Sequence, residues 1–145
     1  MFEQRWLIYA LLGAFAAGLN SIFGKVGMKG IDSNLATAVR SIVMTLFLVT
    51  FCTAIGVWSK IHTIHSKALT MIVLSGVAGA VSWLFFFAAL QLATVSQVAP
   101  IDKMSVPITV ILALLVLGER PSAINWIGVL LVAAGGYLAA MKSHA

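Results

Sequence analysis

Two opposite charges, Asp102 and Lys103, lie side by side in a stretch from Val95 to Leu117 that is otherwise uncharged. Such a carboxylate can bind a cationic group or take up a proton, and such an ammonium can hold the carboxylate ionised or bind a carboxylate of a solute. A charge inside a membrane-spanning segment costs at least a few kcal/mol, so it usually faces a bundle interior or an aqueous cavity. The pair is the strongest candidate for a functional site. A mutually neutralised structural pair, or a lysine that reaches the nearby interface, stays an alternative.

Two prolines, Pro100 and Pro107, flank the pair. A proline has no N–H, so Pro100 cannot donate to the carbonyl of Ser96, and Pro107 cannot donate to that of Lys103. At membrane depth these carbonyls need side chains, water or a solute as partners. We therefore expect a kinked helix in which the lysine ammonium can bind both a freed carbonyl and the Asp102 carboxylate.

Neutral and aromatic side chains are predicted to complete the site. In one continuous helix Asp102, Ser105 and Thr109 would share a face. Asn20 needs a partner in an apolar environment. The remaining candidates are Ser82 and Trp83, which are adjacent and could form a cavity wall.

Arg40 is the candidate that carries a charge in the second apolar segment. It is interpreted as a fixed positive charge at a cavity mouth or as a partner for Asp102, with snorkelling to the interface as the alternative. Thr37, Ser41 and Thr45 make this part of the segment more polar, which favours an inward face.

Weaker motifs do not point to catalysis or metal binding. His62 and His65 lie in a polar connection without further ligands, so we expect an interfacial role and no metal site. Cys52, the one cysteine, is interpreted as a small apolar residue. We expect no cofactor and no enzymatic activity, because no nucleophile or metal motif accompanies the Asp–Lys pair.

The elements that must position these residues are apolar helices. The chain has 145 residues, of which 61% are hydrophobic and 9% charged, whereas soluble domains carry about 25% charged residues. A bilayer core of about 30 Å needs roughly 20 apolar residues in a helix. The sequence predicts a single all-α membrane domain over residues 1–145, with five spans at about 6–23, 35–57, 68–90, 95–117 and 123–141.

Charge and small residues give further expectations. The net charge of +5 lies in short connections and near helix ends without interleaved aromatics, so we expect no nucleic-acid partner. The basic residues are divided almost equally between the two predicted sides of the bilayer, which predicts that the chain can insert both ways.

Small residues at helical spacing predict close helix contacts at Gly13, Ala17 and Gly24, and at Gly128, Gly135, Gly136 and Ala140. The Gly118-Glu119-Arg120-Pro121 turn predicts a helix stop.

Several of these segments resemble one family. The stretch from Ala99 to Val106, followed by Leu117-Gly118-Glu119-Arg120, resembles the five-span EamA-like members of the drug/metabolite transporter superfamily. Residues 126–136 resemble the last span of the family's repeat, Arg40 resembles an arginine near the start of its second span, and Lys25 resembles a basic residue that ends the first.

The resemblance implies a transporter built from one repeat. Ten-span relatives hold two inverted repeats around a central cavity, which implies a homodimer here, antiparallel if the analogy holds. Their substrates include amino acids, sugars, nucleotide conjugates and drugs, so substrate identity stays open. The Asp–Lys pair departs from the small or apolar residues often found there in ten-span members.

The sequence thus predicts a transporter of a small solute in a prokaryotic inner membrane, working by alternating access with possible proton coupling. Its site is expected between the first four spans, with the fifth as a packing or dimer element. Two alternatives stay open: a non-transporting membrane partner, such as a lipid-binding or assembly subunit, and an intramembrane enzyme with an Asp/Lys acid–base pair.

Overall fold

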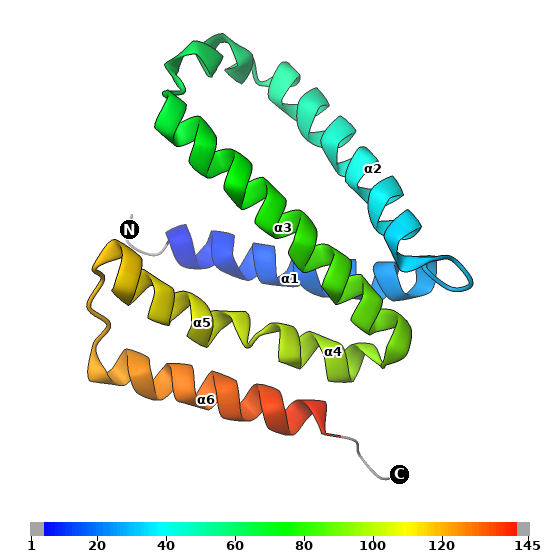
Figure 1. The fold of residues 1–145 in the computed structure, drawn as a ribbon, viewed down its shortest axis with the longest axis vertical. Helices are drawn as coiled ribbons and strands as arrows, with labels where there is room; N and C mark the ends of the chain where they lie inside the picture. Colours follow the sequence, from blue (N-terminus) through cyan, green and yellow to red (C-terminus); the bar gives the residue numbers. More distant parts are fainter. Residues whose placement is uncertain (1–4, 142–145) are drawn as a thin grey trace. The chain divides into compact units, whose positions relative to one another are not determined.

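The computed structural model describes residues 5–141 of the chain. Lys142, which belongs to the charge count above, lies outside the described residues. The helices in chain order are α1 (Arg5–Gly27), α2 (Ser33–Ala54), the 3₁₀ helix η1 (Val57–Thr63), α3 (Ser66–Leu92), α4 (Val95–Asp102), α5 (Ser105–Leu112), the π-helical turn η2 (Ala113–Leu117) and α6 (Ala123–Ala140) (Figure 1). Over residues 5–141 no strand is formed, which confirms the all-α fold class.

Five helical segments are long and apolar enough to cross a bilayer: α1, α2, α3, the stretch Val95–Leu117 and α6. This confirms the number of predicted spans. Helix α1 continues past the predicted end at Phe23, and α2 ends at Ala54 instead of Val57. The early end of α2 has a local cause, because Gly56 adopts a left-handed conformation with a φ of 69° that an α-helix cannot contain.

The predicted connection at residues 58–67 is partly helical. The indole Nε1 of Trp58 donates a hydrogen bond of 3.0 Å to the hydroxyl of Thr53, which fastens η1 to the last turn of α2. The tight 3₁₀ geometry suits such a short connector.

The described chain contains two compact units, one of which spans residues 24–91. In this unit α2 and α3 are antiparallel to each other and are joined by η1 (Figure 1). The carboxylate of Asp32 caps α2 by accepting hydrogen bonds from the N–H groups of Asn34 and Leu35, at 2.9 and 3.1 Å. At the other end of the unit, Phe87 of α3 packs directly against Gly24, where a Cβ would overlap the ring. The close approach predicted at Gly24 is therefore present.

The other unit combines the residues up to Phe23 with those from Leu92 onward. Helix α6 runs antiparallel to α4 and α5 and contacts both (Figure 1). The π-helical turn η2 ends at Gly118, whose φ is 69°. This agrees with the helix stop predicted there. Ser122 then starts α6 in a capping box with Asn125.

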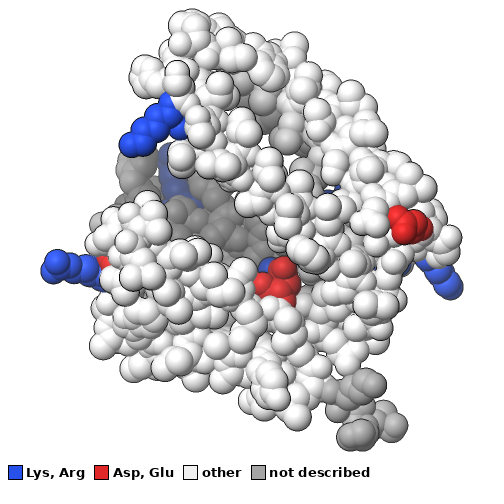
Figure 2. All heavy atoms as spheres, viewed as in Figure 1, with Lys and Arg blue, Asp and Glu red and all other residues white. Residues whose placement is uncertain are grey.

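Little of the chain is enclosed by its own atoms. Among the described residues the buried apolar side chains are Met28, Phe87, Leu90 and Val129, and no membrane-spanning helix contains more than two buried residues. Figure 2 shows few charged residues on the face in view, and many large apolar side chains of the described residues are exposed. Lipid tails can solvate such a surface, as can a second protein chain.

Candidate functional site

The fourth span is broken at the charged pair. Helix α4 ends at Asp102, Lys103 and Met104 form a turn, and α5 begins at Ser105. The N–H of Lys103 donates to Pro100 at 3.2 Å, and the N–H of Met104 donates to Ile101 at 2.9 Å. These bonds reach back three residues, so the chain tightens from α to 3₁₀ geometry at the pair.

This turn corrects the prediction of a freed carbonyl at Lys103. Pro107 has no N–H to give, as expected, but the N–H of Val106 donates to the Lys103 carbonyl at 3.0 Å instead. The tighter turn brings the donor one residue closer along the chain. The lysine ammonium is therefore not needed at this carbonyl.

The ammonium binds the neighbouring carboxylate. Lys103 Nζ lies 3.1 Å from Asp102 Oδ2, and the two side chains are 57% and 33% exposed. Asp102 is the eighth residue of its span, which places it about 10 Å along the helix axis from the span's first residue, against a bilayer core of about 30 Å. A neutralised ion pair therefore lies in a membrane-spanning segment without being enclosed by its own chain.

The shared face of Asp102, Ser105 and Thr109 stays a prediction. The shared face assumed an unbroken α-helix, whereas the turn at Lys103 and Met104 separates Asp102 from the other two. Ser105 is the exposed first residue of α5. Thr109 lines a groove that includes neither of the others.

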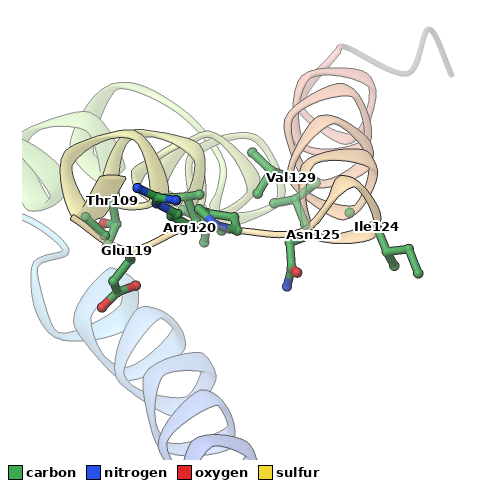
Figure 3. Close-up of a pocket in the computed structure, with 12 residues that line it drawn as sticks. Thr109, Glu119, Arg120, Ile124, Asn125 and Val129 are labelled. Atoms are coloured by element: carbon green, nitrogen blue, oxygen red, sulfur yellow. The ribbon is translucent and has the colours of Figure 1, made fainter. Parts of the chain in front are cut away.

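The groove lies between α5 and α6 and has a volume of about 630 Å³. Its walls are apolar along both helices, with Val129 as the buried member, and its polar residues besides Thr109 are Glu119, Arg120 and Asn125. Figure 3 shows Glu119 and Asn125 extending toward the same side of the groove. An acid, a base and an amide thus line one largely apolar groove.

The sequence predicted no binding role for Glu119, Arg120 and Asn125. Glu119 and Arg120 were interpreted as part of a helix stop, which the structure confirms, and Asn125 received no interpretation. Its carboxamide oxygen accepts a hydrogen bond of 3.0 Å from the N–H of Ser122, so capping accounts for much of its polarity. The Glu-Arg pair in a five-residue connection was the available signal, but spacing alone does not show that α5 and α6 leave a groove there.

The structure brings together two predicted residues, Arg40 and Trp83. The guanidinium carbon of Arg40 lies 4.0 Å from the centroid of the Trp83 ring and 5.0 Å from that of Phe87. Its Nη1 is shielded from solvent. A planar guanidinium over aromatic faces is a favourable cation–π arrangement. Arg40 thus links α2 to α3, and its pairing with Asp102 stays a prediction.

The hydroxyls near Arg40 are satisfied within α2. Thr37, Ser41 and Thr45 donate to carbonyls four residues earlier, at 2.7, 2.8 and 2.9 Å. Thr37 is buried whereas Thr45 is exposed, so this polar stripe runs from an inward to an outward position. The hydroxyls need no cavity to find a partner.

The remaining candidates are placed as follows. Asn20 is half-buried in α1, beside the buried Ser21, and Ser82 is exposed on α3. Their roles in a site stay predictions. Within residues 5–141, no three His, Cys, Asp or Glu side chains gather as a metal site would require, and His62 and His65 have no third ligand there.

The chain is similar to a family of transporters over nearly its full length. The model of the EamA-like transporter family matches residues 4–141. A protein of Sinorhizobium sp. named "uncharacterized transporter in cobO 3′ region" is 39% identical over 139 residues, which cover 96% of this chain and 99% of that protein. No solved structure gives a significant match.

Proposed function

Because the chain belongs to the EamA-like transporter family, we propose that it carries a small solute across the bilayer by alternating access around the Asp102–Lys103 pair. The general activity, transport across a membrane, rests on the family and on the transporter from Sinorhizobium. The site, the mechanism and the coupling are the proposal.

The observation that carries the proposal is the exposed ion pair at the break in the fourth span. One charged residue at the centre of a membrane helix costs about 2.5–3.5 kcal/mol on insertion scales. The Lys103–Asp102 contact of 3.1 Å lowers this cost, but side chains that are 57% and 33% exposed still need a polar environment. An aqueous cavity or a polar surface of a second copy meets that need, whereas lipid tails do not.

In this mechanism Asp102 binds the cationic group of a solute or a coupling proton. Lys103 holds the carboxylate ionised while the site is empty and is released when the cation arrives. Arg40 supplies positive charge, with Trp83 holding its guanidinium flat, and Ser105, Asn20 and Ser82 supply neutral hydrogen bonds. Binding of a cation adds one positive charge to the segment, because Lys103 leaves the carboxylate but stays in the span.

The break itself supports alternating access. Switching needs an element with two discrete arrangements, and hinges are a few residues that absorb changes in φ and ψ. The turn at Lys103 and Met104 connects two short helices, α4 and α5, through 3₁₀ bonds instead of a continuous α ladder. Bending there changes which end of the span exposes the ion pair.

The functional form is proposed to be a homodimer in a prokaryotic inner membrane. One copy leaves its ion pair open and encloses few of its apolar side chains, so a second copy can complete the site. The nearly equal division of basic residues supports an antiparallel dimer. Reporter fusions at the C-terminus test this point, and a strong signal on only one side of the membrane would contradict dual insertion.

Flux measurements in proteoliposomes test the proposed site. The full chain is reconstituted and assayed with amines, amino acids and sugars, with and without a pH gradient. Asp102→Asn is expected to reduce flux of the transported solute at least tenfold, since hydrogen bonds to charged groups contribute about 1.5–3 kcal/mol. Asp102→Glu is the conservative control.

The double variant Asp102→Asn/Lys103→Gln separates transport from structure. It removes both charges, so neither is left alone in the span, and the protein is expected to stay folded while flux is lost. Retained flux in the double variant would show that the pair only braces the helix. Absence of flux for every compound with intact dimers would favour the non-transporting partner instead.

A further inference from the structure

A second cavity, of about 350 Å³, lies within the unit of residues 24–91, where α1 ends and α3 ends. Its base is apolar, because it is lined by Met28 and Leu90, which are 5% and 0% exposed. The polar residues around it are Lys25, Lys29 and Gln91. We propose that this cavity binds the phosphate group of an anionic phospholipid; the proposal is independent of the transport site.

Hydrogen bonds between the α1–α2 connection and α3 build the cavity. Lys25 donates from its Nζ to the carbonyl of Leu90, and Gln91 Nε2 donates to the carbonyl of Ile31 at 2.6 Å. The connection is folded by a bond of 3.0 Å from the N–H of Ile31 to the Met28 carbonyl. The walls are therefore fixed by contacts between residues about 60 positions apart in the chain.

The charge of the cavity favours an anion. Lys25 and Lys29 line it and no acidic residue does. The nearest acid in sequence, Asp32, uses its carboxylate to cap α2. Lys29 is exposed, and its ammonium has no hydrogen bond or ion pair with any residue among 5–141, so it can bind an incoming group.

The position of the cavity favours a lipid over a dissolved anion. It lies at the ends of two membrane-spanning helices and at the connection to α2, which is the level of the lipid headgroups. Basic pockets between membrane helices bind phospholipid headgroups. Two lysines at this level match the phosphate group of an anionic phospholipid.

Native mass spectrometry of the full chain in a neutral detergent tests the proposal. Phosphatidylglycerol and phosphatidylcholine are titrated in parallel, and bound lipid is counted. Phosphatidylglycerol is expected to bind more tightly, and Lys29→Gln is expected to weaken it about fivefold, the effect of one lysine near an anionic surface. Lys29→Arg is expected to retain binding.

The matched control is Lys60→Gln, which removes one charge from η1, outside the cavity. Equal losses for Lys29→Gln and Lys60→Gln would overturn the proposal, because the effect would then be one of net charge. Equal binding of the two lipids would overturn it as well. Inorganic phosphate forms the third arm: if it displaces phosphatidylglycerol at millimolar concentration, the cavity recognises a free phosphate and the lipid assignment is wrong.

Discussion

Replacing Gly136 by alanine tests how closely α6 packs on the helix that carries the ion pair. A Cβ at position 136 would lie 2.9 Å from the carbonyl oxygen of Pro100 and 3.7 Å from its carbonyl carbon. The obstacle is backbone, which cannot rotate away as the end of a side chain can. The same carbonyl accepts the N–H of Lys103 at 3.2 Å, so moving it disturbs the turn beside Asp102.

Gly135 offers a matched control in the same helix. A Cβ there would meet no atom within 4 Å. Alanine exceeds glycine in helix propensity by about 0.5–1 kcal/mol, and this gain applies to both positions. Overpacking in a close contact costs about 1–3 kcal/mol, and this cost applies only to Gly136→Ala. The two variants should therefore differ in free energy of unfolding by about 1–3 kcal/mol, with Gly136→Ala the less stable.

The assay is unfolding in mixed micelles with increasing sodium dodecyl sulfate, followed by circular dichroism. Gly135→Ala is expected to be as stable as the parent protein or more stable. Gly136→Ala should unfold at a lower detergent fraction. If Gly136→Ala matches Gly135→Ala, the contact between α6 and the Pro100 carbonyl is looser than the structure has it, and the reasoning is refuted.

Two further predictions concern α3 and its partners. Gly24→Ala is expected to destabilise the protein by about 1–3 kcal/mol, because its Cβ would displace the buried ring of Phe87. The control Gly27→Ala has open space around it and should not destabilise the protein. Equal unfolding midpoints of the two variants would contradict the contact between Gly24 and Phe87. A double-mutant cycle with Arg40→Lys and Trp83→Leu should give a coupling energy of about 1 kcal/mol from the stacked guanidinium, and additive effects on unfolding would count against the cation–π contact.

Composition and hydropathy were sufficient for the fold class. Five apolar stretches in 145 residues indicate membrane helices, because a bilayer requires every backbone polar group to be paired and a helix pairs them within its own segment. Helix ends were less predictable. Gly118 stopped its helix as expected, whereas α2 ended at Ala54 and not at the predicted Val57, where Gly56 adopts a left-handed conformation.

The candidate site shows the same division. The adjacency of Asp102 and Lys103 and the missing N–H of Pro107 follow from the sequence alone. Which group pairs with the Lys103 carbonyl does not follow from the sequence. Local tightening to 3₁₀ geometry made the N–H of Val106 its donor. That change is a choice among backbone conformations, which residue types alone do not fix.

Sequence by itself determined that this chain is a membrane protein with a costly ion pair inside one span, because amino-acid chemistry and segment length are sufficient for both conclusions. Tertiary structure alone decided which residues meet across the chain. Arg40 stacks on Trp83, Gly136 receives the Pro100 carbonyl, and Lys25 binds the Leu90 carbonyl. These contacts depend on how helices are oriented about their axes, which hydropathy does not fix when nearly every face is apolar.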